Sequence, residues 1–333
     1  MKKKLISIVV PSYNAEKYLN KGVRTFLHES LLDKIEIIIV NDGSIDHTAK
    51  IAERLKKQYP KTITVVHKEN GGHGSTINKG IDIARGKYFC VVDADDWVHT
   101  DSLIKLVDFL KDSDSDLILT NCSIVDPAGN VTGHKMVPAL PEGKTVNIND
   151  YLLKIKNVEM HNYCIKTAVL RNSNTKCHEH HFYVDQEYVM YSLLYVKTVT
   201  YLNLDFYRYM VGYNEQSVSL DSRRKNEQQG IDVIQYLVDF YNKNKEKMTK
   251  NQKIHYSRKI AWLARAIYAL YWSYNPSRFY QKKMISFDQW LKERSPDIYK
   301  ANKNIPIAIF RITKYSAYIF GAMLFRKVNH ISD

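Results

Sequence analysis

The sequence has few cysteines, no long uncharged apolar run and no dinucleotide-binding glycine motif. Each of these features argues against one class of protein. Only four of its 333 residues are cysteines, and none has the paired spacing of a zinc site or a redox motif. Such cysteines are typical of a reducing cytoplasm, where we expect the protein to be located. No run of 18 uncharged residues occurs, so we expect no transmembrane span.

The amino-terminal segment MKKKLISIVVPSYN begins with lysines, as export signals do. Its apolar run covers only residues 5–10 and ends at Pro11, so we expect a first β-strand and no export signal. No GxGxxG motif follows this strand. That absence argues against a dinucleotide-dependent oxidoreductase, the alternative in which Asp42 would bind an adenosine ribose.

The net charge of +14 lies entirely in the last third of the chain. Residues 1–221 contain 27 Lys and Arg against 27 Asp and Glu, whereas residues 222–333 contain 22 against 8. We therefore expect two parts, a neutral domain over residues 1–221 and a basic helical region over residues 222–333.

The neutral part alternates short β-forming runs with helical patterns. The runs cover residues 5–10, 35–40, 63–67 and 88–92, and the helical patterns cover roughly residues 15–30, 46–59 and 75–84. This alternation predicts an α/β fold with parallel strands joined by right-handed crossovers. A polar loop follows each strand, so we expect all four loops at the carboxyl edge of one sheet, where such folds bind ligands.

The stretch YFCVVDADDW, residues 88–97, begins with an apolar run that predicts a strand buried on both faces. Three carboxylates follow this run directly. Asp93, Asp95 and Asp96 repel one another at neutral pH, and their oxygens suit a hard cation such as Mg²⁺ or Mn²⁺. From the residues alone, the alternative is an acidic loop that caps a helix beginning near Thr100.

Four motifs occur in a fixed order: PSYN followed by Glu16, then NDGSIDHT, then ENGG with Asn78, then DADDW. Together they resemble the inverting family 2 glycosyltransferases of GT-A fold, over about residues 5–220. The resemblance implies a Rossmann-like, mostly parallel GT-A sheet, here with a C-terminal helical extension. It also implies a nucleotide-sugar donor, usually linked to UDP, and Mn²⁺ or Mg²⁺ as cofactor.

The resemblance assigns roles in donor binding. Tyr13 would stack on the base and Asp42 would accept a hydrogen bond from its imide N–H. Asp93 would lie near the ribose, and Asp95 would bind the metal that bridges the diphosphate. The other candidates for donor binding are Pro11, Asn14, Glu16, Asn70, Gly72, His73, Asn78, Ala94 and Arg208.

Two of these positions leave alternatives open. His73 lies in the glycine-rich GGHG, which could let backbone approach the donor or could form a turn with a solvent-facing histidine. Ile77 stands where many relatives carry an arginine, so a phosphate contact would have to come from Lys79 or Arg208.

A direct-displacement transferase needs a carboxylate that removes the proton of the acceptor hydroxyl. The resemblance places it at a helix start within VDQEY, where Asp185 is the candidate and Glu187 the reserve. Val184 replaces the first acid of the family's pair, and a carboxylate at a helix start is equally a cap. Cys177 and the histidines at 178, 180 and 181 are too closely spaced for zinc, so we expect a loop over the acceptor pocket.

Three further segments belong to the neutral part. Residues 117–122 predict a strand, and residues 126–144 predict a hairpin or loop near the acceptor. Residues 201–219 predict a closing strand with a turn in which Ser217 or Ser219 could support the site. A simple capping turn is the alternative.

The basic region contains a helical pattern around residues 258–272 and a second apolar stretch, residues 305–325. Arg311 and Lys314 interrupt this second stretch, which favours a helix lying in an anionic membrane interface. A helical cap on the catalytic domain or a homo-oligomer interface is the alternative. Nucleic acid also fits the charge, but no nucleic-acid-binding fold is recognisable, so we expect none.

The resulting expectation is a metal-dependent inverting hexosyl- or N-acetylhexosaminyltransferase. It would move one sugar from a nucleotide donor to a glycan, for instance a polyprenyl-diphosphate-linked intermediate of cell-surface polysaccharide synthesis. It would act in the cytoplasm, peripherally on the inner face of the cell membrane. A non-catalytic module that binds nucleotide sugar or membrane and organises other enzymes is the alternative.

Overall fold

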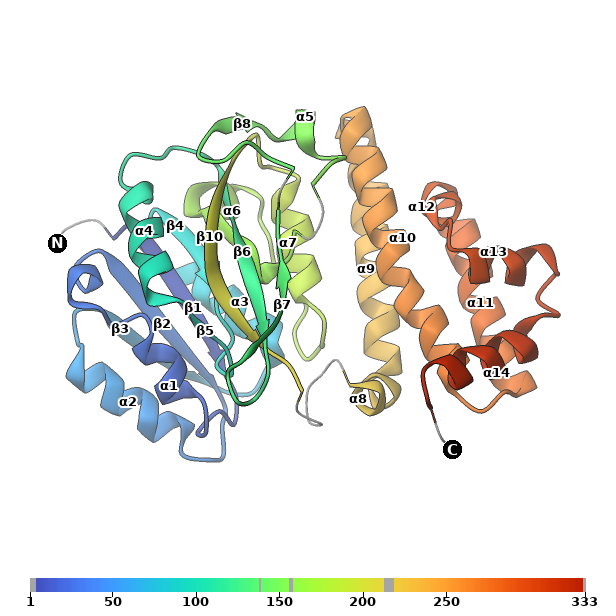
Figure 1. Cartoon of the computed structure of the whole chain (residues 1–333), viewed down its shortest axis with the longest axis horizontal. Coiled ribbons are helices and arrows are strands. Elements are labelled where there is room, and N and C mark those ends of the chain that lie inside the picture. Colours follow the sequence, from blue (N-terminus) through green and yellow to red (C-terminus); the bar gives the residue numbers. More distant parts are fainter. Residues whose placement is uncertain (1–3, 138, 156–157, 213–218, 332–333) are drawn as a thin grey trace. The chain divides into compact units, whose positions relative to one another are not determined.

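The computed structural model describes residues 4–137, 139–155, 158–212 and 219–331 (Figure 1). The chain forms two compact units, Met1–Asn214 and Glu215–Asp333. The charge pattern placed this boundary a few residues later, after Asp221.

The first unit is built on one sheet. Its strands are β1 (Ile6–Ser12), β2 (Ile35–Asp42), β3 (Ile63–Lys68), β4 (Tyr88–Val91), β5 (Trp97–Val98), β6 (Leu117–Val125), β7 (Val131–Lys135), β8 (Thr145–Asn147), β9 (Tyr163–Lys166) and β10 (Thr198–Met210). Their order is β3-β2-β1-β4-β9-β6-β10-β5, with β7 on β6 and β8 on β10. Strands β3, β2, β1 and β4 are mutually parallel, and β9 is antiparallel to both of its neighbours. The predicted α/β fold with a mostly parallel sheet is confirmed.

The register of the parallel strands brings their loops to one edge. Ser12, the last residue of β1, lies opposite Asn41, and Asp42 at the end of β2 lies opposite Lys68 at the end of β3. Strand β4 pairs with β1 and ends in the acidic motif. The four polar loops therefore leave the sheet at the same edge, as predicted.

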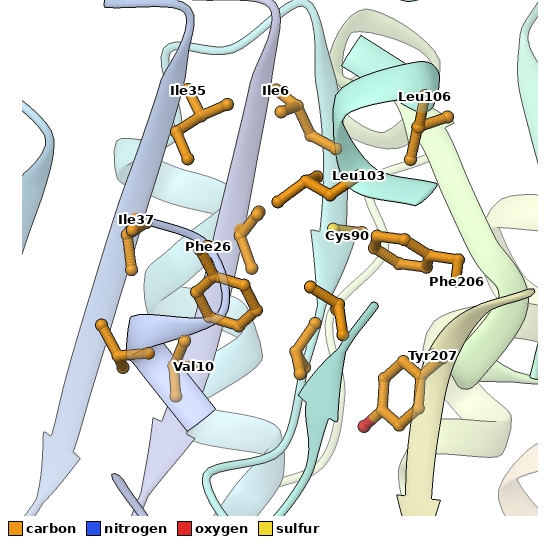
Figure 2. Packing of buried hydrophobic residues seen from close by; sticks show 14 of the residues in the cluster. Ile6, Val10, Phe26, Ile35, Ile37, Cys90, Leu103, Leu106, Phe206 and Tyr207 are labelled. Carbon is orange, nitrogen blue, oxygen red and sulfur yellow. The ribbon is translucent and has the colours of Figure 1, made fainter. Parts of the chain in front are cut away.

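The core explains why the central strands are apolar on both faces. All residues of β1, β2 and β4 are buried. Figure 2 shows one side of this core, where Ile6 and Ile37 of neighbouring strands pack with Phe26 and with Leu103 from a covering helix. Each such side chain contributes about 1.5–3 kcal/mol on burial.

The helices of the first unit mostly connect or cover these strands. They are α1 (Leu19–Arg24), α2 (Thr48–Gln58), α3 (Gly72–Ile83), α4 (Thr100–Leu110), α5 (Ile148–Tyr151), α6 (Thr167–Asn172) and α7 (Asp185–Leu193), with 3-10 turns η1 (Glu29–Leu31) and η2 (Met160–Asn162). The helix predicted at residues 15–30 is much shorter. It ends at Arg24, where Gly22 O accepts from both the backbone N of Thr25 at 3.1 Å and Thr25 Oγ1 at 2.7 Å. The predicted hairpin after β6 is confirmed by its antiparallel pairing with β7.

The described part of the second unit is helical, as predicted. Its helices are α8 (Leu220–Lys225), α9 (Glu227–Asn244), α10 (Lys250–Ser273), α11 (Arg278–Arg294), α12 (Pro296–Ala301), α13 (Ile305–Ile312) and α14 (Tyr318–Val328), with the 3-10 turn η3 (Lys245–Lys247). Helix α10 packs against α9, α11, α12 and α14 (Figure 1). A capping box between Thr249 and Gln252 begins α10.

The prediction of one helix across residues 305–325 is wrong, because the stretch forms α13 and α14. Lys314 and Tyr315 adopt left-handed backbone with φ of 48° and 71°, which interrupts the helix between α13 and α14. Both Arg311 and Tyr315 bind the buried Asp288, at 2.7 and 3.2 Å. Within the described residues, no helix has both the length and the apolar character needed to cross a bilayer.

Candidate active site

The loops after β1 and β2 are joined by hydrogen bonds. Asn14 N donates to Ser44 Oγ at 3.0 Å, and Asn14 Oδ1 accepts from Ile45 N at 3.0 Å. Asn14 has a positive φ of 48°, which asparagine tolerates better than most residues. Glu16 Oε2 accepts from the backbone N of His47 at 2.9 Å. These two predicted donor-binding residues thus fix the shape of the paired loops.

Tyr13 and Asn14 are exposed in the first loop, whereas Pro11 is buried at the end of β1. The tyrosine retains 54% of its accessible surface. Its ring is therefore available for stacking on a flat ligand at the carboxyl edge of the sheet.

Asp42 is only 2% exposed, and both of its carboxylate oxygens are used. Oδ1 accepts from Lys68 Nζ at 2.7 Å and Gly71 N at 3.0 Å, while Oδ2 accepts from Gly72 N at 2.8 Å. Asn70 Nδ2 donates to the backbone oxygen of Asp42 at 3.0 Å. The negative charge therefore stabilises the amino-terminal end of α3. Since a carboxylate oxygen accepts about two hydrogen bonds, Oδ2 can still receive one more donor.

The glycine-rich GGHG forms the first turn of α3. A Cβ on Gly74 would lie 2.2 Å from His178 O, and one on Gly72, which has a φ of 80°, would lie 3.1 Å from His180 N. His180 N donates to Gly71 O at 2.6 Å. These glycines let the segment before α7 lie directly against α3, which gives them a role independent of a donor.

Asn78 holds the same segment. Its Nδ2 donates to Cys177 O and its Oδ1 accepts from Cys177 N, both at 2.8 Å. The neighbouring Ile77 is 0% exposed, so the position that carries arginine in many relatives faces the core here. Asn78, predicted to bind the donor, therefore couples α3 to the start of α7.

Asp93 is bound from two sides. Its Oδ1 accepts from His73 Nε2 at 2.8 Å, and its backbone N donates to Tyr207 Oη at 3.1 Å. Burial alone would lower the pKa of His73, but the charges of Asp93, Asp185 and Asp95 and the hydrogen bond raise it. His73 therefore points at the acidic motif. The alternative interpretation, a turn with a solvent-facing histidine, does not describe it.

Asp96 is the most buried acid of the motif, at 2% exposure. Its Oδ2 accepts from Tyr207 Oη and its Oδ1 accepts from Met210 N, both at 2.7 Å. Burial and the charges of Asp95 and Asp93 raise the pKa of Asp96 well above its usual range. Burial and the charge of Asp93 raise the pKa of Asp95 to about 6. This excess of buried negative charge is what a bound cation would compensate.

Asp93, Asp96 and His161 offer ligand atoms that all lie within 4.8 Å of one another. Two carboxylates and an imidazole suit Mn²⁺ better than Mg²⁺, which prefers oxygen ligands alone. Asp95, the predicted metal ligand, does not belong to this cluster, although it lies in the same motif. His161 was not among the predicted site residues, and it lies in η2, directly before β9.

His161 is held in place by aromatic rings and an acid. Its ring centroid lies 4.3 Å from that of Tyr209 and 4.9 Å from that of Tyr207. Glu159 Oε2 lies 3.6 Å from His161 Nδ1 and 2.6 Å from Lys135 Nζ. Burial would raise the pKa of Glu159, but His161 and Lys135 lower it to about 2. Glu159 is thus an ionised support behind the imidazole.

The two candidates for the base occupy different environments. Asp185 is the first residue of α7, is half-buried, and accepts from Gln186 Nε2 at 2.6 Å. Glu187 is 0% exposed and accepts from His178 N at 2.8 Å and from its ring Nδ1 at 3.0 Å. Burial raises the pKa of Glu187. The structure therefore places Glu187 inside the protein, as a support for the segment before α7.

The remaining predicted positions have other contacts or lie outside the described residues. Arg208 forms an ion pair with Asp205 at 2.5 Å, and alternation along β10 puts it on the face opposite Tyr207. Ala94 is 7% exposed and belongs to the core. Ser217 lies outside the described residues. Ser219 accepts from Ser222 N at 3.2 Å and begins α8, which is the capping turn of the alternative interpretation.

A family comparison decides the identity of the first unit. Residues 7–178, just over half of the chain, match the model of Glycosyl transferase family 2. The chain belongs to glycosyl transferase family 2. The resemblance expected from the four motifs is therefore confirmed.

Relatives within family 2 match only part of their own length. Glycosyltransferase GlyG of Streptococcus pneumoniae is 38% identical over 118 residues, which is 35% of this chain and 38% of GlyG. The minor teichoic acid biosynthesis protein GgaA of Bacillus subtilis is 31% identical over 153 residues, which is 44% of this chain and 34% of GgaA. The match thus spans about a third of the length of these relatives.

Solved structures extend the likeness to nearly the whole chain. The crystal structure of S. aureus TarS 1-349 has a TM-score of 0.63 and 18% identity, and the match covers 97% of this chain and 91% of the TarS 1-349 chain. TarS has also been solved in complex with UDP, with a TM-score of 0.62, 19% identity and the same coverage. At this identity the likeness shows the fold alone, and it confirms the predicted GT-A-type architecture with C-terminal helices.

Proposed function

We propose that this family 2 protein is a metal-dependent inverting glycosyltransferase that moves one sugar from a UDP-linked donor to a glycan acceptor. The observation that carries the proposal is the cluster of Asp93, Asp96 and His161, whose ligand atoms lie within 4.8 Å of one another next to the loops at the carboxyl edge of the sheet. The complex of TarS with UDP supports the uridine nucleotide. The transferred sugar would be a hexose or an N-acetylhexosamine.

The paired loops would bind the nucleotide. The exposed ring of Tyr13 would stack on uracil, and Asp42 Oδ2 would accept from its imide N–H through the remaining lone pair. The loop that carries Tyr13 is already fixed by the hydrogen bonds of Asn14 and Glu16. Binding of the nucleotide would therefore cost little loop entropy.

A divalent ion, Mn²⁺ or Mg²⁺, would be held by Asp93, Asp96 and His161, next to Asp95. Members of this family generally use such an ion. When bound, it supplies positive charge that stabilises the leaving diphosphate. Arg208 is not part of this proposed site, because it is paired with Asp205 on the other face of β10.

Asp185 would act as the base. As the acceptor oxygen bonds to the anomeric carbon, the bond from that carbon to the diphosphate breaks, and the acceptor proton passes to the Asp185 carboxylate. Displacement from the opposite side inverts the anomeric configuration. The other candidate, Glu187, is engaged with His178 and fully buried.

The acceptor would be a glycan of a bacterial surface polymer, for instance one carried on a polyprenyl diphosphate at the inner face of the cell membrane. The relative GgaA, named for teichoic acid biosynthesis, supports a surface polymer. A non-catalytic module that binds nucleotide sugars is the competing function, and it requires no role for Asp185.

Incubation with a panel of nucleotide sugars, followed by measurement of the released nucleotide, tests the proposal. We expect release of UDP from one donor with Mn²⁺, none with chelator, and transfer to an acceptor glycan only when Asp185 is present. Binding of UDP without turnover of any donor, in the presence of acceptor extracts, would favour the non-catalytic module.

A further inference from the structure

Helices α13 and α14 carry an exposed apolar surface. We define the α13–α14 apolar face by eight side chains and their exposures: Ile305 73%, Ile309 50%, Ile312 81%, Ile319 47%, Phe320 72%, Met323 60%, Leu324 50% and Val328 66%. The three isoleucines of α13 recur at intervals of four and three residues, which places them on one side of the helix. Eight large apolar side chains left exposed on two consecutive helices mark an interaction site.

The opposite sides of both helices are also apolar, but they are buried. Ile307 and Phe310 of α13 are 1% and 2% exposed, and Tyr318 and Ala322 of α14 are 0% exposed. Packing against the rest of the second unit therefore explains the apolar residues on only one side of each helix. A helix that is apolar all round is ordinarily covered all round, by protein or by lipid.

The charge around this face has one sign. Residues 298–331 contain six lysines and arginines and no aspartate or glutamate. Lys314 and Lys327 are exposed and take part in no ion pair among the described residues. Arg311 does not contribute, contrary to the sequence interpretation, because it is bound to Asp288 and lies 3.6 Å from the ring centroid of Tyr299.

This charge favours one occupant. A second copy of the chain, docked by the same face about a two-fold axis, would set the lysines of one copy against a face that has lysines of its own and no acid within residues 298–331. Anionic lipid headgroups pair with exposed lysines, while the acyl region accepts the apolar side chains between them.

We infer that the α13–α14 apolar face inserts into the interface of an anionic membrane, with Lys314 and Lys327 at the level of the lipid headgroups. The two short helices lie in the plane of the bilayer, since no described helix is long and apolar enough to cross it. The membrane is the location given in the proposed function, and this surface would be its point of attachment. Its binding depends only on the second unit and not on catalysis.

Cosedimentation of the full chain with vesicles tests this surface. Wild-type protein should bind vesicles of phosphatidylcholine with 30% phosphatidylglycerol more tightly than vesicles of phosphatidylcholine alone. The double variant Phe320→Glu/Met323→Glu should bind both kinds at least about tenfold more weakly, because two charges would enter the apolar layer. The fold should persist, because both side chains are already exposed.

Two further variants separate the contributions. Val131→Glu/Leu153→Glu adds the same charge at exposed apolar positions of the first unit, 48% and 40% exposed, and should bind like wild type. Lys314→Gln/Lys327→Gln should lose about tenfold or more in affinity for anionic vesicles while its binding to neutral vesicles is unchanged.

Three outcomes would overturn the inference. They are wild-type protein that stays in the supernatant with anionic vesicles, a Phe320→Glu/Met323→Glu variant that binds as wild type does, and a wild-type oligomer in light scattering that this variant splits without any vesicle binding to lose. UDP binding by the same variants should equal that of wild type. Failure of the membrane inference is thereby distinguishable from failure of the catalytic proposal.

Discussion

His73 Nε2 lies 2.8 Å from Asp93 Oδ1, and this contact joins the first turn of α3 to the acidic motif after β4. The same turn contains Gly74, on which the segment before Asp185 rests. The proposed metal site and the proposed base are therefore positioned by one short piece of helix.

We expect His161→Gln to weaken Mn²⁺ binding by about ten- to a hundredfold while the protein remains folded, because the variant removes the imidazole from the ligand cluster. Calorimetric titration of Mn²⁺ in the presence of UDP measures the change. His134→Gln is the matched control, since His134 pairs with Ser123 on β6 and lies outside the cluster. Equal losses in the two variants would contradict a specific role for His161.

Mn²⁺ binding should weaken as the pH falls below 6. Without metal, burial and the charge of Asp93 raise the pKa of Asp95 to about 6, so below that pH a proton must leave before a cation is favoured. Affinity should fall by about tenfold or more per pH unit below 6, because the raised pKa of the ligand Asp96 adds a second proton that the ion must displace. Titrations in two buffers of different ionisation enthalpy should show proton release near pH 6. An affinity that is constant between about pH 7.5 and 5 would show that Asp95 does not sense the ion.

Asp185→Asn should abolish transfer, by about a hundredfold or more, and leave UDP binding unchanged. The acceptor proton would have no base to receive it, whereas the nucleotide does not depend on this carboxylate. Glu187→Gln is the informative comparison, because its main effect should be a lower melting temperature through the weakened bonds to His178. Transfer that survives in Asp185→Asn but disappears in a folded Glu187→Gln protein would exchange the two roles.

Gly74→Ala should destabilise the protein by about 1–3 kcal/mol, although alanine is the better helix former. The new Cβ would lie 2.2 Å from His178 O, a backbone atom that cannot move without shifting the segment before α7. Gly133→Ala is the control, as its Cβ would meet only Ile124 side-chain atoms at 3.5 Å or more. Chemical denaturation of both variants gives the free energies of unfolding. A stable Gly74→Ala protein would show that the segment is not held against α3.

The sequence could predict the parts of the site that lie at strand ends. The runs before Asn41 and before Asp93 are buried and apolar, so their polar successors had to emerge at one edge of the sheet. The histidine at position 161 could not be found in this way. It reaches Asp96 only because η2 packs on β10, a contact between segments that no local pattern specifies.

Three further features of the structure depend on contacts between segments that are distant in the sequence, which a local sequence pattern does not reveal. The face on which Arg208 lies follows from the register of β10 after the shifts around Asp205, which the sequence pattern does not reveal. The division of residues 305–325 into two helices accompanies contacts with Asp288, which binds Arg311 at the end of α13 and Tyr315 in the break itself. The glycines of GGHG predicted that another group packs closely against this backbone. In the structure that group is the segment of the chain before α7.

Calorimetric titration of the full chain with UDP and with ADP, in Mn²⁺ and in chelator, tests the central claim most directly. The structure places an exposed Tyr13 and a cluster of Asp93, Asp96 and His161 at one edge of the sheet. We predict binding of UDP that requires Mn²⁺, weaker binding of ADP, and loss of UDP affinity in Tyr13→Ala. Equal affinities for UDP and ADP, or UDP binding that is unchanged by chelator, would contradict the proposed metal-dependent UDP-sugar transferase.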